Sequence, residues 1–272
     1  MKILVVGGGN MGQSFAKSFI RNYLADTSKF SVLEKDVSKF ENLKKIGIKN
    51  ILQEPNEQLS EADLIVLAVK PQSFNELAYQ IKPFISDEQV FLSIMAGVNI
   101  STIQKKLSVT KVIRSMPNIA AQIGKGMSVF TSSNEVSRIE LVTVQNLLES
   151  TGKNLYVANE DLVDAGTAIS GSGPAYVLYF MDAILNAAKN LGFTKKEAEM
   201  LVAQTFLGIL EYFNTSDNNC KDLIEKISSK GGTTEAAIQY LKQHKIADNI
   251  KEAIYKAYNR AKELGKFEKN KN

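Results

Sequence analysis

In the first half of the chain, short apolar runs alternate with amphipathic stretches. Continuous apolar runs of strand length are typical of a parallel sheet covered on both faces, and the stretches between them have helical spacing. The alternation predicts an α/β fold. The predicted strands are residues 3–6, 30–33, 63–69, 89–94, 111–116, 126–131 and 155–157, and the predicted helices are 11–24, 38–46 and 135–150.

From Glu160 onward the strand pattern disappears and the spacing is helical. A long helix is expected to start near Ser172, a plausible N-cap, with Pro174 in its first turn. Further helices are predicted over 194–213, 220–227 and 234–243, and 265–272 reads as a basic, frayed tail. We therefore predict two domains, residues 1–158 with a doubly wound, mostly parallel sheet and residues 159–272 with helices alone.

The two long helices of the second domain are apolar or small on nearly every side. A domain of about a hundred residues offers too few neighbours to bury such helices. The pattern predicts a homodimer joined through them and leaves open whether dimers assemble into a larger ring. A stable folded monomer at micromolar concentration would contradict the prediction.

A glycine-rich turn follows the first strand, with Gly7, Gly9 and Gly12 in the spacing Gly-x-Gly-x-x-Gly. Gly7 can supply the turn, Gly9 lets the backbone approach a pyrophosphate, and Gly12 lets the helix pack closely on its strand. The helix N-terminus attracts an anion. The strand, turn and helix together predict a Rossmann-type dinucleotide site.

The second strand ends at Glu34 and Lys35. An acidic residue about 20 positions after the turn accepts hydrogen bonds from the adenine ribose and favours NAD, whereas a lysine there can pair with the extra phosphate of NADP. A solvated charged loop is the plain alternative. Ala68, Val69, Lys70 and Pro71 follow a central strand, so they are expected beside the cofactor.

The composition argues against several classes of binding partner and site. The 272 residues are 44% hydrophobic, enough for a large core, and a net charge of +4 is spread without basic clusters, which argues against nucleic acid. A single cysteine, Cys220, and a single histidine, His244, argue against a disulfide and against a metal site. Neither a signal peptide nor a membrane span is apparent, and a cytoplasmic location is expected.

A second chemical stretch lies at residues 228–235, between two predicted helices. Gly231 and Gly232 allow successive N–H groups to point into one concavity, the following helix adds its dipole, and hydroxyl groups flank it. This stretch suits a substrate carboxylate. The alternative is a capped turn, with Thr233 or Ser229 as the cap and Glu235 in the first turn.

At this point the whole chain resembles the pyrroline-5-carboxylate reductases, enzymes of the last step of proline synthesis. The resemblance rests on residues 7–12, 68–72, 114–118, 170–176 and 228–234. It implies a helical dimerisation domain and a carboxylate site at Ser229, Gly231, Gly232, Thr233 and Thr234. It also implies that the dinucleotide, NADPH or NADH, is lined by Val6, Gly7, Gly9, Asn10, Met11, Gly12, Glu34, Lys35, Asn56, Ala68, Val69, Lys70, Pro71, Met95 and Ala96.

Three positions depart from the family pattern: Glu34-Lys35, where an uncharged residue followed by Arg or Ser is common, Ile119-Ala120 in place of Thr-Pro, and Lys230 in place of Pro. The first leaves the choice between NADPH and NADH open.

The implied reaction is hydride transfer to the cyclic imine 1-pyrroline-5-carboxylate, giving L-proline, with Thr234 as the hydrogen-bond donor to the nitrogen. Two alternatives remain at this level. A 3-hydroxyacid dehydrogenase would need a lysine acid/base on the first helix of the helical domain, where residues 172–179 contain none. An NAD(P)H-sensing protein without turnover would not need the carboxylate site.

Overall fold

The computed structural model describes residues 1–23 and 27–267. Its chain divides into two compact units, Met1–Pro174 together with the residues from Lys256 on, and Ala175–Tyr255. The predicted boundary after residue 158 falls inside the first unit. Among the described residues, no helix is both long and apolar enough to cross a membrane.

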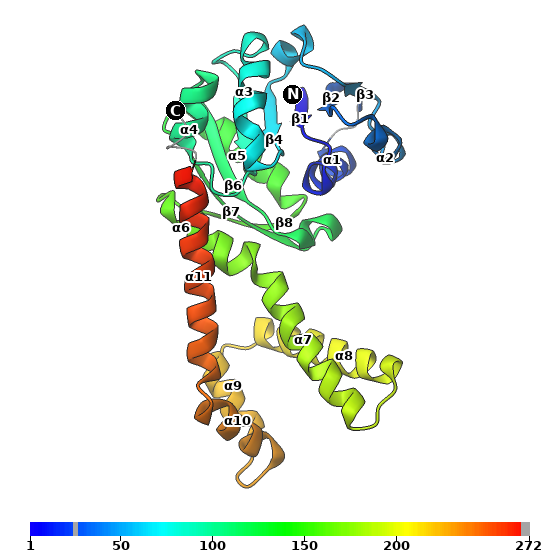
Figure 1. The fold of residues 1–272 in the computed structure, drawn as a ribbon, viewed down its shortest axis with the longest axis vertical. Coiled ribbons are helices and arrows are strands. Elements are labelled where there is room, and N and C mark those ends of the chain that lie inside the picture. The colour runs from blue at the N-terminus through cyan, green and yellow to red at the C-terminus, as the bar shows by residue number, and fades with distance from the viewer. Residues whose placement is uncertain (24–26, 268–272) are drawn as a thin grey trace. The chain divides into compact units, whose positions relative to one another are not determined.

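The first unit is built on an eight-stranded sheet in the order β3-β2-β1-β4-β5-β6-β7-β8 (Figure 1). All neighbouring strands are parallel except β6 and β7, which are antiparallel. The strands are β1 Ile3–Val6, β2 Phe30–Leu33, β3 Asn50–Leu52, β4 Leu64–Leu67, β5 Val90–Ser93, β6 Val112–Met116, β7 Gly126–Ser132 and β8 Gly152–Tyr156. The predicted doubly wound, mostly parallel sheet is confirmed.

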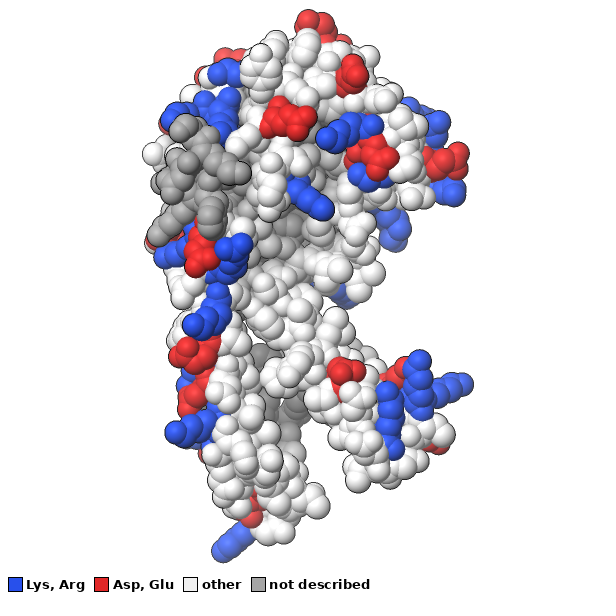
Figure 2. All heavy atoms as spheres, in the orientation of Figure 1, with Lys and Arg blue, Asp and Glu red and all other residues white. Residues whose placement is uncertain are grey.

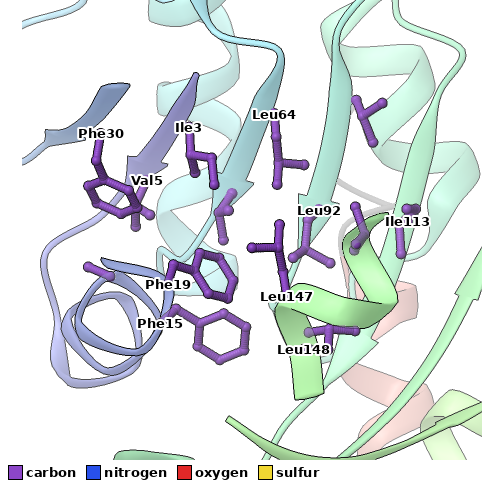
Figure 3. Packing of buried hydrophobic residues seen from close by; sticks show 14 of the residues in the cluster. Ile3, Val5, Phe15, Phe19, Phe30, Leu64, Leu92, Ile113, Leu147 and Leu148 are labelled. Carbon is purple, nitrogen blue, oxygen red and sulfur yellow. The ribbon is translucent and has the colours of Figure 1, made fainter. Parts of the chain in front are cut away.

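Helices cover both faces of this sheet, and alternate residues of each strand serve the two faces. Ile3 and Val5 of β1 pack in one apolar cluster with Phe15 and Phe19 of α1, whereas Leu4 and Val6 belong to the cluster on the opposite face. Figure 3 shows the first cluster, in which α5 supplies Leu147 and Leu148. Continuous apolar runs were therefore the correct signature of strands buried on both sides.

The helices of the first unit are α1 Asn10–Tyr23, α2 Phe40–Lys45, α3 Phe74–Ile81, α4 Ile100–Leu107, α5 Arg138–Glu149 and α6 Asp161–Gly166. The sequence prediction missed β3, α3, α4 and α6. These elements are short, three to eight residues each. A pattern of so few positions cannot separate helix from strand or loop.

The second unit consists of helices: most of α7 Gly173–Asn190, then α8 Lys195–Thr215, α9 Cys220–Ile227, α10 Thr233–Gln243 and the first part of α11 Ile246–Phe267. Thr194 caps α8 in a capping box with Glu197. The predicted helices are confirmed, but α11 includes residues 265–267 of the predicted frayed tail, and residues 268–272 lie outside the described part.

The predicted start of the first long helix is confirmed, since α7 begins at Gly173 with Pro174 in its first turn, but the predicted N-cap at Ser172 is wrong. The chain enters α7 from α6 through a π-helical turn, Thr167–Gly171, in which the N–H of Ser172 donates to the carbonyl of Thr167 at 2.8 Å. Ser172 has helical φ and ψ of −85° and −18°, whereas an N-cap residue needs an extended backbone. Ser172 is therefore inside a continuous helical path and caps nothing.

Large apolar side chains remain exposed along the second unit. Leu178, Tyr179, Leu191, Met200 and Leu210 are between 55% and 81% exposed, and the buried apolar residues of this unit are Ala198, Val202 and Leu223. On the face drawn in Figure 2, charged side chains leave much of the surface over α7 and α10 uncovered. Such an apolar surface is expected where another chain packs.

Candidate functional site

The turn between β1 and α1 has the geometry that its glycines predict. Gly7 has a φ of +106°, and a Cβ there would lie 2.7 Å from the carbonyl oxygen of Ala68. A Cβ on Gly12 would overlap the carbonyl oxygen of Gly7, so both positions require glycine for the protein's own packing. A Cβ on Gly9, in contrast, would meet no described atom within 4 Å. Glycine at that position keeps space open for something outside the chain.

A cavity of about 270 Å³ opens beside this turn, at the carboxyl ends of β1, β2 and β4. Ligands bind at this edge in open parallel sheets. Of the residues predicted to line the cofactor, it contains Val6, Gly7, Gly9, Glu34, Lys35, Ala68, Val69 and Lys70. It also contains residues that the sequence prediction missed, Leu33, Lys39, Gln53, Pro55, Ser73, Glu76, Leu77 and Gln80. The last three of these lie on α3, which the sequence pattern did not predict.

Other predicted cofactor residues do not line this cavity: Asn10, Met11, Gly12, Asn56, Pro71, Met95 and Ala96. Asn10 and Gly12 lie in the first turn of α1, and Asn56 caps a short 3₁₀ turn by accepting from the N–H of Gln58 at 3.0 Å. Met95 is 2% exposed and belongs to an apolar cluster.

Glu34 is a buried carboxylate at the end of β2 and is only 6% exposed. Its Oε2 accepts hydrogen bonds from the N–H of Gly8 at 2.8 Å and from the Lys39 Nζ at 3.0 Å, and its Oε1 accepts from the N–H of Asp36 at 2.9 Å. Lys35 is exposed. The alternative of a solvated loop is therefore wrong for Glu34.

The second chemical stretch connects α9 to α10. Gly231 has a φ of +72°, and Gly232 is the N-cap of α10 with an extended backbone and no side-chain cap bond. The capped-turn alternative is therefore wrong in naming Thr233 or Ser229 as the cap. Thr233 and Thr234 are the first two residues of α10. Their N–H groups have no carbonyl of a preceding turn to bind and are available to an anion.

Two other N–H groups of this loop bind within the chain. The N–H of Gly231 donates to Glu235 Oε2 at 2.6 Å, and the N–H of Gly232 donates to the Ser229 carbonyl at 3.0 Å. The side chain of Ser229 lies against Gly232, because a Cβ on that glycine would be 2.5 Å from the Ser229 Oγ. The predicted carboxylate site thus keeps its helix N-terminus and its hydroxyl groups, while Glu235 occupies one predicted donor.

An ion cluster around the buried Arg114 joins β6 to α6. Arg114 is 2% exposed, and its Nη1 donates to Glu160 Oε1 at 3.0 Å while its Nη2 donates to Asp164. Glu160 also accepts from the N–H of Ile100, at the start of α4, at 2.8 Å. Nearby, the Asn118 side chain donates to the Ser170 carbonyl in the π-helical turn at 3.0 Å. These bonds tie the segment that precedes α7 to the sheet.

Comparison with known proteins covers both halves of the chain. Residues 160–264 match the family model "Pyrroline-5-carboxylate reductase dimerisation", and residues 2–97 match "NADP oxidoreductase coenzyme F420-dependent". The pyrroline-5-carboxylate reductase of Aquifex aeolicus is 33% identical over 97% of both chains. Pyrroline-5-carboxylate reductase 2 of Bacillus subtilis is 32% identical over 97% of this chain and 95% of its own.

Solved structures show the same likeness. The pyrroline carboxylate reductase of Plasmodium falciparum with NADP bound has a TM-score of 0.87 and 27% identity, and that of Coxiella burnetii has a TM-score of 0.87 and 30% identity, each over 97% of this chain and 98% of the other. The prephenate dehydrogenase of Aquifex aeolicus, with 18% identity and a TM-score of 0.54, shares the fold alone. The chain belongs to the pyrroline-5-carboxylate reductase family.

Proposed function

We propose that this protein reduces 1-pyrroline-5-carboxylate to L-proline with NADH or NADPH as the hydride donor. One observation carries the proposal: the reductases that it resembles match it over nearly the full length of both chains, so the likeness includes both the dinucleotide half and the helical half. The cavity beside the glycine turn and the loop before α10 each supply a suitable anion site.

The cavity fits a dinucleotide in its position and its chemistry. It lies at the sheet edge where such cofactors bind, and Gly9, which lines it, leaves space for a pyrophosphate just before the N-terminus of α1. When bound, the reduced nicotinamide supplies a hydride from its C4 atom. The chain itself provides binding and orientation, through the residues proposed above to line the dinucleotide.

The substrate carboxylate is assigned to the loop before α10, at Ser229, Gly231, Gly232, Thr233 and Thr234. The free N–H groups of Thr233 and Thr234 and the dipole of α10 support this assignment. In the reaction, a hydride adds to the imine carbon while the C=N π electrons move to nitrogen, which takes up a proton. Neither a nucleophilic cysteine nor a histidine acid is needed, because an imine is already electrophilic.

Thr234 is the proposed catalytic residue, as the hydroxyl donor to the substrate nitrogen or to a water that relays the proton. Replacing a positioned proton donor costs about a hundredfold to ten-thousandfold in rate. Thr234→Ala is expected to lower kcat by that factor while the affinity for the reduced nucleotide changes little. Thr234→Ser keeps a hydroxyl and is expected to retain most of the activity. Unchanged turnover in Thr234→Ala would contradict the proposed role of the Thr234 hydroxyl in proton delivery.

The activity itself is tested by the loss of absorbance of NADH and of NADPH in the presence of 1-pyrroline-5-carboxylate. Oxidation of either nucleotide that depends on the imine, with proline as the product, supports the proposal. Nucleotide oxidation that instead requires a keto acid would favour the hydroxyacid dehydrogenase alternative. Nucleotide binding without turnover would favour a sensing protein.

The family membership makes the chain a homo-oligomer, and we propose a homodimer joined through the exposed apolar side chains of α7 and α8, with assembly of dimers into a ring as a further step. We also propose that residues 1–158 form the dinucleotide-binding domain and residues 159–272 the dimerisation and substrate-binding domain. A cytoplasmic location is supported by the single cysteine, which leaves no intramolecular disulfide.

A further inference from the structure

The dinucleotide cavity is lined by charged side chains where the adenine ribose of a bound cofactor is expected. Three residues at the end of β2 and the start of α2 carry charge into this region: Glu34, Lys35 and Lys39. In this fold, the group at the end of the second strand meets the ribose 2′ position, which bears a hydroxyl in NADH and a phosphate in NADPH. The charge of Glu34, and whether its side chain can move away, therefore decide whether NADH or NADPH binds more tightly.

We propose that Glu34 makes this enzyme select NADH over NADPH. This inference rests on the function proposed above and specifies its cofactor. The Glu34 carboxylate is fixed in place and keeps one acceptor site for a further hydrogen bond. Its oxygens accept three hydrogen bonds, from Gly8, Asp36 and Lys39, and a carboxylate offers about four acceptor sites. Within the described part of the chain, Oε1 accepts from the N–H of Asp36 alone, and its second acceptor site suits a ribose hydroxyl as donor.

A 2′-phosphate would meet the same carboxylate as a repulsive neighbour. A phosphate monoester carries nearly two negative charges at neutral pH and has no proton to donate to Glu34. The Glu34 side chain is 7% exposed and cannot turn away without breaking its three hydrogen bonds. The repulsion therefore acts in a buried setting, where water and salt screen it poorly.

The two lysines do not offset this repulsion. Lys39 Nζ is already shared between Glu34 at 3.0 Å and Asp36 at 3.7 Å. Lys35 is exposed and, within the described part of the chain, has no ion pair that would hold it in place. An exposed lysine on a flexible side chain contributes little to the binding of a fixed anion. The charges in this part of the cavity therefore favour NADH, whose adenine ribose carries hydroxyl groups and no phosphate.

Direct titration of the full-length protein with NADH and with NADPH, without imine substrate, tests the inference through nucleotide fluorescence. We expect NADH to bind roughly tenfold or more tightly than NADPH at low salt. The preference should shrink only slightly as salt rises, because the buried carboxylate is poorly screened. Equal or tighter binding of NADPH would overturn the inference.

The variant Glu34→Gln removes the charge and keeps the size of the side chain. It is expected to raise the affinity for NADPH by roughly tenfold while that for NADH falls by less, so that the preference largely disappears. The matched control is Glu41→Gln, which makes the same charge change on α2, where Glu41 is exposed and 4.0 Å from Lys45. It should leave the ratio of the two affinities unchanged.

A ratio unchanged in Glu34→Gln would overturn the role of Glu34. Thermal unfolding shows whether that variant folds, and if it does not, the ratio of affinities in the unmodified protein and its salt dependence still decide the question. Failure of both nucleotides to bind would overturn the proposed function itself. Tight binding with the preference reversed would overturn only the selection of NADH.

Discussion

The two units of this chain differ in how completely they bury their apolar residues. In the first unit, helices cover both faces of the sheet, and Phe15, Phe19 and Phe30 are fully buried. In the second, Tyr179 of α7 is 76% exposed and Leu191, directly after α7, is 81% exposed. The first unit buries its own core, whereas the second exposes the apolar side chains that we propose to pack against a second copy of the chain.

This difference separates the roles of the two halves. A dinucleotide site formed within one covered sheet requires no partner, so nucleotide binding is expected to survive dissociation. In the proposed dimer the helical unit gains stability from association, because burial of apolar surface is the main favourable contribution to folding and to assembly. The four variants below test this contrast, from the largest expected effect to the smallest.

Arg114→Met is expected to destabilise the first unit most. Arg114 is the partner of Asp164 and Glu160, and its removal leaves a largely buried carboxylate unpaired at Asp164. Breaking a buried ion pair from one side costs about 3–5 kcal/mol. Urea unfolding followed by circular dichroism measures the loss. Lys195→Met, which breaks an exposed pair with Glu199, serves as a control and should change little. Equal stability of both variants would contradict the structural role of the cluster.

Leu210→Glu is expected to break the association of the second unit. Leu210 is 55% exposed on α8, and a carboxylate there would be buried without a partner in the assembled protein. The loss of a central contact of this kind weakens association on the order of a hundredfold. Sedimentation velocity should show dissociation, while nucleotide titration stays normal. Gln204→Glu, on a polar exposed position of the same helix, should sediment like the unmodified protein. Unaltered sedimentation of Leu210→Glu would place the interface elsewhere.

Gly9→Ala separates folding from binding within the first unit. A Cβ at this position meets no described atom within 4 Å, so the fold should keep its thermal stability. The same methyl group would occupy the space proposed for the pyrophosphate and weaken nucleotide binding by roughly tenfold. Gly12→Ala is the contrasting variant, because its Cβ overlaps the Gly7 carbonyl and should lower stability itself. Normal nucleotide affinity in Gly9→Ala would show that the pyrophosphate does not bind beside this turn.

Glu140→Gln should produce the smallest effect, and one that depends on pH. Burial raises the pKa of Glu140, but hydrogen bonds from Ser137 and from Lys111 outweigh it and lower the pKa below its ordinary 4.5. A lowered pKa stabilises the fold at pH values above 4.5, and this stabilisation is lost as the pH falls through the folded-state pKa.

At neutral pH, Glu140→Gln is therefore expected to cost at most about 1 kcal/mol, because a Gln keeps the capping box at α5 but loses the ion pair with Lys111. The difference from the unmodified protein should narrow in acid. Unfolding curves at neutral pH and at acid pH measure both values. A difference that grows as the pH falls would contradict this explanation.

The strands were predictable because their signal is local. β1 and β2 have the predicted bounds, since each is a run of apolar residues buried on both faces. The antiparallel pairing of β7 with β6 was not predictable in the same way, because pairing direction depends on distant segments. The π-helical turn before α7 was missed because a Ser-Gly-Pro sequence is also a normal helix start.

The glycine turn was predicted together with its reasons, since a positive φ at Gly7 and the close approach at Gly12 require glycine whatever surrounds them. The part of the cavity that α3 supplies was missed, because residues 73–80 come together with the turn only through the order of the strands. The bonds of Glu34 could not be read from the sequence either, since Gly8 precedes it by many residues.

By itself, the sequence determined the α/β class, the change to helices after residue 160, the dinucleotide turn, the loop before α10 and the family. These features depend on local periodicity and on residues whose backbone needs do not change with context. Only the tertiary structure decided that Glu34 is buried and accepts hydrogen bonds from three donors, that Arg114 joins β6 to α6, and that the N–H of Gly231 donates to Glu235. Burial and hydrogen-bond partners depend on which distant segments meet, and no local pattern records that.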